Sequence, residues 1–378
     1  MTNVVGTKKK SKRIFYFDAL RTLAIISVIL FHVFQNLSFM VVGDYAAIPS
    51  INWFITDFTG TFFRCGVDIF LMLSGALSLG RVWEIKPFLS KRIPRIVYPF
   101  VLWGFILTVV IFLVSVFIPS SVAIFHHYDW GTFASYDLKG FITFLLKGYM
   151  AKSRIWFRPY WFFWMILGTY LTMPIINRWL LHADLKEAEY FLFFWLITCL
   201  FDFTLGFSFP IQLKYFAGAI GMVILGYYLR HTERKIFNNV YCGIIMMVIP
   251  VICMIFISYL MSDTSEIYYF SRYSIFLAVE SMGIFVLFKN FKQLNLNFNF
   301  LTNPDGIFRK SVFSIAKYSY GIYLVHHVIL NFLMLILIST LPFKGLYLAL
   351  FIGTLLLSWG ILALLNRVPY LNRYIGAK

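Results

Sequence analysis

Long apolar blocks separated by short polar segments make up most of this chain. Each block holds about 18 or more predominantly apolar residues, and a helix of that length, rising about 1.5 Å per residue, crosses a hydrocarbon layer of about 30 Å. The pattern therefore predicts about ten transmembrane helices in one bundle, and an even number of crossings places both termini on one side. The predicted helices span residues 14–42, 54–80, 93–118, 159–180, 188–206, 213–230, 240–261, 271–290, 313–340 and 343–366.

The composition favours a membrane protein over a soluble one. Hydrophobic residues make up 60% of the 378 residues and charged residues only 13%, whereas an average soluble domain carries about a quarter charged residues. The expected fold class is an all-α, polytopic integral membrane protein. No linker-like segment divides the chain, so we expect one membrane domain over residues 1–378, with a basic cytoplasmic tail at 1–13 and an extracytoplasmic loop at 119–158.

The net charge of +17 follows membrane topology rather than nucleic-acid binding. If the N-terminal tail is cytoplasmic, most Lys and Arg residues fall in segments on the cytoplasmic side, as the positive-inside rule requires. We therefore expect a multi-pass protein of the cell inner or cytoplasmic membrane, with both termini in the cytoplasm. The lipid bilayer is an expected partner and nucleic acid is not, whereas the oligomeric state is left open.

No metal site is expected. The four cysteines lie within apolar blocks without metal-ligand spacing, and buried cysteine usually behaves as a small hydrophobic residue. In the loop, His126, His127 and Asp129 could be ligands, but adjacent histidines rarely chelate one ion together and no third ligand follows at helical spacing. The segment 137–150, DLKGFITFLLKGYM, predicts a short interfacial helix instead.

Three ionisable residues, Asp18, Arg21 and His32, fall inside the first predicted helix. Charges in the hydrocarbon are costly, so such residues usually face the bundle interior and mark a site. Arg21 and His32 are 11 residues apart, which corresponds to three turns plus about 20°, so they share one helix face about 16.5 Å apart along the axis. Asp18 lies one turn from Arg21 and can pair with it. A lone histidine in a helix is more often a core residue whose ring is hydrogen-bonded by its surroundings. Whether His32 has a functional role therefore depends on which other ionisable residues lie near it.

Other ionisable residues fall at a similar depth. Arg64 and Asp68 stand at i and i+4 in the second predicted helix, a spacing that predicts an ion pair on one face. His326, in the ninth predicted helix, lies close to the depth of His32, and Glu280 in the eighth falls near the midplane. Together these residues predict a polar chamber at mid-depth, although Arg64 and Asp68 could equally form a structural bridge.

Basic residues also gather at the cytoplasmic mouth of the third predicted helix. Lys91, Arg92 and Arg95 lie within five residues of one another. Guanidinium groups match the oxygens of phosphate, so the cluster could bind a phosphorylated cytosolic donor. Positive-inside topology accounts for the same cluster equally well.

Five segments resemble a known family in their order and spacing. They are FDALR followed by ten residues and His32, then GVDIFLMLSG, KRIPRIVYP, PYWFFWMILGTYLTMPII and SYGIYLVHH. The chain resembles the acyltransferase-3 family of membrane proteins over nearly its whole length. Within that family it is most similar to the branch that contains the enterobacterial common antigen O-acetyltransferase and the intercellular-adhesin O-succinyltransferase.

The resemblance implies a membrane O-acyltransferase with a ten-helix core. Such an enzyme takes an acyl group, usually acetyl, from cytosolic acyl-CoA and delivers it to a hydroxyl of a cell-envelope glycan or lipid-linked sugar. Acetyl-CoA, or succinyl-CoA, is then a co-substrate and no cofactor is bound permanently. The sequence does not distinguish acetyl from succinyl, nor one glycan acceptor from another.

The resemblance also implies roles for particular residues. The family's Arg–His pair falls on Arg21 and His32, and its R-x-x-R element falls on Arg92 and Arg95. Tyr323 and His326, together with Gly66, Ser74 and Gly75, match further motif positions, for which catalysis and helix packing both stay open. For Gly75 we favour packing, because small residues let helices approach closely.

These residues suggest a mechanism as a hypothesis. Lys91, Arg92 and Arg95 bind the phosphates of acyl-CoA, and the pantetheine arm rises past Arg21, while Asp18 or Arg21 orients the reacting groups. His32 acts as the general base on the acceptor hydroxyl. Direct transfer is favoured over a covalent relay, because no G-x-S-x-G motif is present. The alternative function is an exporter or flippase of a glycan or lipid-linked sugar, in which the buried ionisable residues form a proton pathway.

Overall fold

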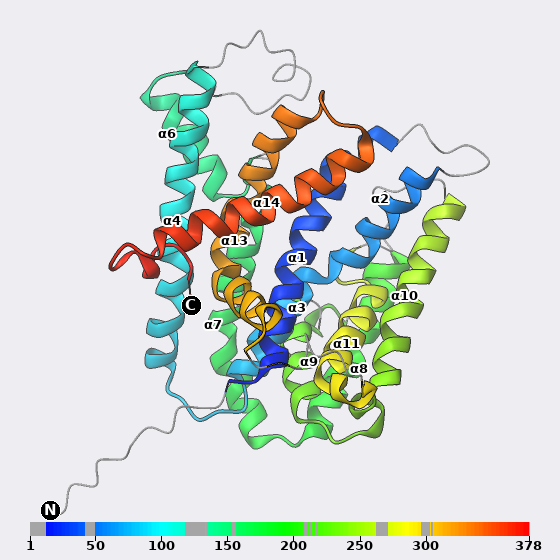
Figure 1. Cartoon of the computed structure of the whole chain (residues 1–378). Coiled ribbons are helices and arrows are strands. Elements are labelled where there is room, and N and C mark those ends of the chain that lie inside the picture. Colours follow the sequence, from blue (N-terminus) through cyan, green and yellow to red (C-terminus); the bar gives the residue numbers. More distant parts are fainter. Residues whose placement is uncertain are drawn as a thin grey trace, which may run out of the picture.

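The computed structural model describes most of the chain. The described residues are 13–41, 50–117, 133, 135–152, 156–207, 211, 213–216, 218–261, 271–295, 303 and 305–377. All the regular elements within these ranges are helices, which confirms the all-α fold class (Figure 1). Almost all of the predicted basic tail, and His126, His127 and Asp129 of the predicted loop, lie outside the described residues.

Long helices alternate with short helical turns along the chain. The α-helices are α1 (Phe15–Leu37), α2 (Ile51–Phe62), α3 (Gly66–Ser78), α4 (Ile85–Phe117), α6 (Leu138–Tyr149), α7 (Trp161–His182), α8 (Leu185–Leu200), α9 (Ala219–His231), α10 (Val240–Met261), α11 (Ile275–Asn290), α13 (Ile307–Leu337) and α14 (Phe343–Leu365). The short helical turns are η1 (Ser38–Val41), η2 (Phe63–Cys65), η3 (Arg158–Tyr160), η4 (Phe201–Leu205), η5 (Lys214–Phe216), η6 (Lys235–Asn238), η8 (Phe291–Leu294) and η9 (Leu371–Arg373).

Each predicted apolar block falls on helical residues, but the predicted number of crossings is corrected. Among the described residues, 7 helical spans are long and apolar enough to cross a membrane. They are Phe15–Leu37, Ile51–Ser78, Ile85–Phe117, Leu185–Leu205, Val240–Leu260, Ile307–Leu337 and Phe343–Leu365. The chain is a multi-pass membrane protein, and its described part contains fewer full-length spans than the ten expected.

Three helices that correspond to predicted crossings, α7, α9 and α11, are not among these membrane-spanning segments, for two reasons. α9 has 13 residues and α11 has 16, so they rise only about 20 Å and 24 Å. α7 has 22 residues, but its Thr and Tyr residues, Pro174, Asn177 and Arg178 lower its mean hydropathy. These helices are instead packed against others of the bundle, since α9 contacts α3, α8 and α11.

Helix α1 lies at the centre of the bundle and carries the first set of candidate residues. It contacts α2, α3, α11, α13 and α14, and in Figure 1 it runs through the middle of the molecule, beside α13. Most of its apolar residues are buried by these neighbours. Polar side chains on α1 therefore face other helices rather than lipid.

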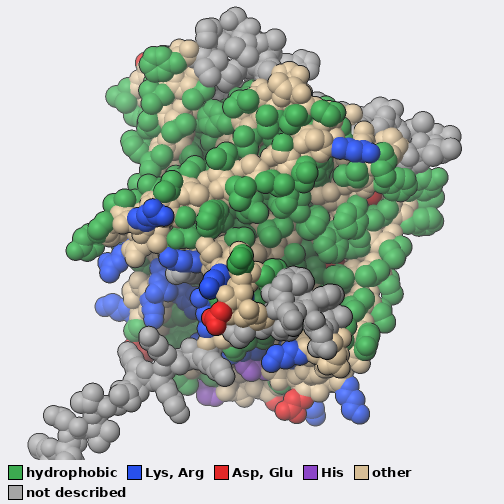
Figure 2. All heavy atoms as spheres, viewed as in Figure 1, with side chains coloured by type: hydrophobic (Ala, Val, Ile, Leu, Met, Phe, Trp, Pro, Cys, Tyr) green, Lys and Arg blue, Asp and Glu red, His purple; other side chains and the backbone are tan. Residues whose placement is uncertain are grey.

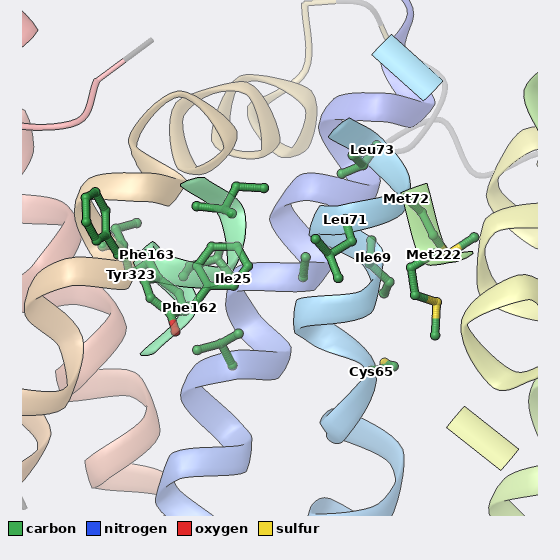
Figure 3. Close-up of a cluster of buried hydrophobic side chains, with 14 of the residues drawn as sticks. Ile25, Cys65, Ile69, Leu71, Met72, Leu73, Phe162, Phe163, Met222 and Tyr323 are labelled. Atoms are coloured by element: carbon green, nitrogen blue, oxygen red, sulfur yellow. The ribbon is translucent and has the colours of Figure 1, made fainter. Parts of the chain in front are cut away.

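The crossing of α3 and α9 depends on two glycines. A Cβ atom at Gly75 would lie 1.8 Å from the carbonyl oxygen of Val223, and one at Gly226 would lie 2.0 Å from that of Met72. Each distance is impossible for a real side chain, so the two backbones meet only because both residues are glycine. The structure thus supports the packing role expected of Gly75. Figure 3 shows part of the buried hydrophobic cluster, which includes Met72 of α3 and Met222 of α9.

The short helix predicted over residues 137–150 is present as α6 (Leu138–Tyr149). The Asp137 side chain caps its first turn by accepting a hydrogen bond of 2.7 Å from the Gly140 backbone N–H. The helix packs on α4, and the Tyr149 hydroxyl donates to the Val101 carbonyl oxygen at 2.6 Å. The chain then leads through η3 into α7 and so brings Arg158 and Trp161 to the wall of a cavity.

Basic and apolar side chains are separated on the molecular surface. On the face shown in Figure 2, most Lys and Arg side chains gather toward the end at which α1 and α4 begin, and hydrophobic side chains cover most of the remainder. An apolar surface of this extent is suited to lipid rather than water.

Candidate functional site

Three histidines from two neighbouring helices meet inside the bundle. His32 lies on α1, and His326 and His327 lie on α13. The ring centre of His32 is 5.2 Å from that of His326 and 4.9 Å from that of His327. All three side chains are buried. The similar depth predicted for His32 and His326 is therefore observed, with His327 as an unexpected third member.

The hydrogen bonds of these histidines define where their protons lie. His32 Nδ1 is 2.9 Å from Oε1 of Gln35, and His326 Nδ1 is 2.8 Å from the Tyr323 carbonyl oxygen. His327 Nδ1 is 3.2 Å from the Trp156 carbonyl oxygen. Because carbonyl oxygens only accept, Nδ1 of His32 and of His326 carries the hydrogen and Nε2 of each neutral ring keeps the lone pair. Nδ1 of His327 also lies 3.4 Å from the amide nitrogen of Asn331, which only donates, so either tautomer of His327 has a partner. Nε2 of His326 is buried without a hydrogen-bond partner among the described residues.

His32 lines a cavity of about 420 Å³ that we call the upper cavity. Its walls come from α1, the junction of α2 with α3, the start of α7 and the residues before α11. The lining residues are Val28, Phe31, His32, Gln35, Phe63, Arg64, Val67, Arg158, Trp161, Ser271, Arg272 and Tyr323. Its volume lies in the range of about 300–1,000 Å³ that ligand pockets usually occupy.

Two arginines of the upper cavity lie against aromatic rings. The guanidinium carbon of Arg272 is 3.3 Å from the ring centre of Trp161, and that of Arg64 is 4.9 Å from the ring centre of Phe31. Cation–π contacts of this kind are stronger where water is excluded. The rings therefore hold positive charge in place at the wall of the cavity.

A second, smaller cavity of about 70 Å³, the middle cavity, adjoins the upper one. Tyr323 lines both, and its hydroxyl donates to the Pro159 carbonyl oxygen at 2.7 Å. The middle cavity also contains Arg21 and Arg92, and its lining is Arg21, Phe70, Leu73, Ser74, Leu77, Arg92, Ile96, Phe162, Ile166, Tyr170, Ser319, Tyr320 and Tyr323. Arg21 thus lines the middle cavity and His32 lines the upper cavity, and Tyr323 lines both.

Asp18 holds two arginines near the start of α1. Its carboxylate accepts a hydrogen bond of 2.6 Å from Arg13 Nε and lies 3.5 Å from Arg21 Nη1. The pairing of Asp18 with Arg21 predicted from their spacing is observed. The hydrogen bond from Arg13 to this carboxylate raises the pKa of Arg13. Asp18 therefore restrains Arg21 without itself lining the middle cavity.

The expected donor-binding residues divide between two cavities. Lys91 and Arg95 line a third cavity of about 680 Å³, the lower cavity, together with Arg373 from the C-terminal segment. Arg92 instead lines the middle cavity, where its Nη2 donates to Ser78 Oγ at 3.0 Å. Tyr320 lines both of these cavities. The three cavities therefore form a series of neighbours in which Tyr323 lies between the upper and middle cavities and Tyr320 between the middle and lower ones.

Two of the expected chamber residues lie elsewhere. Asp68 and Glu280 are fully buried but do not line the upper cavity. Arg64 and Asp68 do not form the predicted ion pair, since both carboxylate oxygens of Asp68 lack a hydrogen-bond partner among the described residues. The reason is that the turn η2 interrupts the helix at Arg64. At this turn the Arg64 guanidinium is directed into the upper cavity, 4.9 Å from the ring centre of Phe31, whereas Asp68 does not line that cavity.

Sequence reasoning missed four residues of the upper cavity region. His327 stands next to His326 in the segment LVHH, and the doubled histidine was the available signal. Gln35 stands one turn after His32, within hydrogen-bonding reach on the same helix. Arg158 and Arg272 precede α7 and α11, and in the sequence they look like ordinary basic residues at helix ends.

The comparison with known protein families decides the class of this site. A family model described as an acyltransferase domain matches residues 14–363. The chain belongs to the acyltransferase-3 family. No curated protein and no solved structure matches the chain.

As an acyltransferase-3 protein, the chain is a membrane acyltransferase that brings together an acyl donor and an acceptor. The matched range contains all residues of the upper and middle cavities and ends before the C-terminal part of the lower cavity. Similarity to the branch of the common antigen and intercellular-adhesin enzymes stays a prediction.

The site has the groups that acyl transfer requires. A neutral imidazole with a free Nε2 lone pair can take a proton from a hydroxyl, and nearby guanidinium groups can stabilise an oxyanion. No group of three or more His, Cys, Asp or Glu side chains in the described part of the chain could hold a metal ion.

Proposed function

We propose that this protein is an O-acyltransferase that moves an acyl group, most simply acetyl, from cytosolic acyl-CoA to a hydroxyl of a cell-envelope glycan or lipid-linked sugar. The observation that carries the proposal is the position of Tyr323, which lines both the cavity of Arg21 and Arg92 and the cavity of His32. Two substrates that enter from opposite ends would meet there.

The donor enters through the lower and middle cavities. Lys91 and Arg95 bind phosphate groups of CoA in the lower cavity, and Arg92 binds the donor further in. Guanidinium and ammonium groups suit phosphate oxygens. The narrow middle cavity then takes the extended pantetheine arm and leads the thioester past Arg21 toward Tyr323.

His32 is the general base. Its Nε2 takes the proton of the acceptor hydroxyl while the hydroxyl oxygen attacks the thioester carbonyl carbon. The tetrahedral intermediate collapses as the carbon–sulfur bond breaks, and the leaving CoA thiolate takes the proton from the imidazolium. The acetyl group ends on the acceptor oxygen and no external oxidant, reductant or base is consumed.

Several neighbours position this base. The hydrogen bond from His32 Nδ1 to Gln35 keeps the lone pair on Nε2. Arg21 lies one cavity below, held by Asp18, where it can orient the incoming thioester. In the proposed orientation the start of α1 faces the cytoplasm, and the protein resides in the cell inner or cytoplasmic membrane. Both termini are then cytoplasmic, because Arg373 of the C-terminal segment lines the lower cavity together with Lys91 and Arg95 near the start of α4. The basic surface near the start of α1 and α4 supports this orientation.

The proposal is tested with purified protein in detergent and radiolabelled acetyl-CoA. The wild type should bind acetyl-CoA and release labelled acetyl to water or an added acceptor, whereas an exporter or flippase should do neither. His32→Ala should lower the rate by about 10²–10⁴-fold, the usual contribution of a general base. His182→Ala, which removes an exposed histidine at the end of α7, is the matched control. Equal rates for wild type and His32→Ala would refute the assignment.

A further inference from the structure

The lining of the upper cavity carries one sign of charge. Arg64, Arg158 and Arg272 all contribute to it, and neither Asp nor Glu occurs among its lining residues in the described ranges. These arginines come from three separate places in the chain, the α2–α3 junction, η3 and the residue stretch before α11. Cationic side chains are expensive at membrane depth and are usually kept there for a bound group or pathway.

We propose that the upper cavity binds the acceptor through an oxyanion, a carboxylate or a phosphate, beside the hydroxyl that receives the acyl group; this rests on the proposed acyl transfer. A neutral sugar has only hydroxyl groups with which to contact the positively charged lining. An acceptor with an acidic sugar or a sugar phosphate also offers an opposite charge, and guanidinium forks bind both kinds of oxyanion.

The position of the arginines assigns the anion to the acceptor side. Arg158 is exposed at the surface and also lines the cavity, so the cavity reaches the surface there. The donor phosphates have separate basic residues, Lys91 and Arg95, in the lower cavity beyond Tyr320. An anion at Arg158 and Arg272 therefore arrives with the second substrate.

Arg272 has the geometry of a positioned anion receptor. Its guanidinium lies 3.3 Å over the ring of Trp161, which fixes the plane of the group through a cation–π contact. A planar guanidinium stacked on one face presents its N–H donors along its edge. Gln35 and His32 line the same cavity, so an anion bound by Arg272 would place the rest of the sugar within reach of the base.

The experiment compares two acceptors that differ in charge alone. Methyl glucuronide carries a carboxylate, and methyl glucuronamide carries a neutral amide of nearly the same shape. Binding of each to the purified full-length protein is measured by saturation-transfer NMR in detergent, and acetyl transfer from acetyl-CoA is measured in parallel. Glucose 1-phosphate supplies the phosphate arm and shows which oxyanion is preferred.

We expect the wild type to bind at least one of the two anionic sugars about tenfold more tightly than the amide. Arg272→Gln should remove that preference, and Arg158→Gln, at an exposed position where folding is less at risk, should weaken it. Arg367→Gln, an exposed arginine after α14, should leave it unchanged. Equal binding of charged and neutral sugars would overturn the proposal, as would a preference that survives both cavity substitutions.

Two further results separate this proposal from its alternatives. If Arg272→Gln lowered only the use of succinyl-CoA and left the glucuronide preference intact, the anion would belong to the acyl group and the acceptor assignment would be wrong. Acetyl-CoA hydrolysis by the wild type reports on the proposed function independently. Hydrolysis without any preference for an anionic sugar would refute the acceptor proposal alone.

Discussion

His32 depends on its neighbours for its protonation state and direction. The Gln35 side chain accepts from Nδ1, while His326 and His327 place two further rings within about 5 Å. Since Nδ1 of His32 and of His326 donates to an oxygen, Nε2 of each of these two rings keeps its lone pair.

The role of the Gln35 contact can be tested without substituting His32, the proposed base. Gln35→Ala should lower kcat about tenfold to a hundredfold, less than loss of the base itself, with KM for acetyl-CoA unchanged. The reason is that the imidazole loses the acceptor that fixes its tautomer. Steady-state assays in detergent measure both constants. Gln35→Glu, which retains an acceptor, should restore most of kcat, and failure of this rescue would assign Gln35 a packing role.

The individual site residues were only partly predictable. Asp18, Arg21, His32 and His326 stood out because ionisable residues are rare in apolar helices. Arg158 and Arg272 did not, since a basic residue at a helix end is common in any membrane protein. Their common cavity is formed by tertiary packing between distant segments, which no local spacing encodes.

At the level of single elements, two features position the site. The turn η2 separates α2 from α3 and directs Arg64 into the upper cavity, and the glycine contact between α3 and α9 fixes α3 at short range. The apolar blocks in the sequence predicted the positions of the helices, because the hydrophobic pattern reflects burial in lipid or protein. They did not predict the break at η2 or the short lengths of α9 and α11, because helix continuity depends on local backbone geometry.

The glycine crossing gives a stability prediction. Gly75→Ala should lower the free energy of unfolding by about 1–3 kcal/mol, the usual cost of overpacking, because the new Cβ would overlap the Val223 carbonyl. Thermal unfolding in detergent measures the effect. Gly168→Ala, in α7, is the control, since a Cβ there meets no atom within 4 Å. An unchanged melting temperature for Gly75→Ala would show that α3 and α9 can move apart at no cost.

At the scale of the whole molecule, the three cavities follow one another through shared lining residues. Lys91 and Arg95 lie at one end, Tyr320 and Tyr323 at the junctions, and His32 at the other end. In the proposed mechanism, this order places recognition of the donor and activation of the acceptor at opposite ends of the series. The sequence had singled out residues at each end and, from its motif, Tyr323, whereas the place of Tyr320 between two cavities became evident only from the folded structure.

The division of basic residues between cavities predicts a specific kinetic pattern. Lys91→Ala and Arg95→Ala should each raise KM for acetyl-CoA about tenfold, because a lost charged hydrogen bond costs about 1.5–3 kcal/mol. With S-acetyl-pantetheine, which lacks the nucleotide phosphates, the same variants should match the wild type. Steady-state kinetics with both donors provide the comparison, with Arg367→Ala as the control. Equal defects with both donors would exclude a phosphate-binding role.

The central claim is that donor and acceptor reach His32 from opposite sides of the membrane. It is tested most directly in proteoliposomes of uniform orientation, with radiolabelled acetyl-CoA sealed at the face of Lys91 and Arg95 and a mixture of methyl glucuronide and methyl glucoside supplied only at the other face. The account predicts labelled, O-acetylated sugar in the acceptor compartment, and none with His32→Ala. Transfer only when donor and acceptor share one compartment would contradict it.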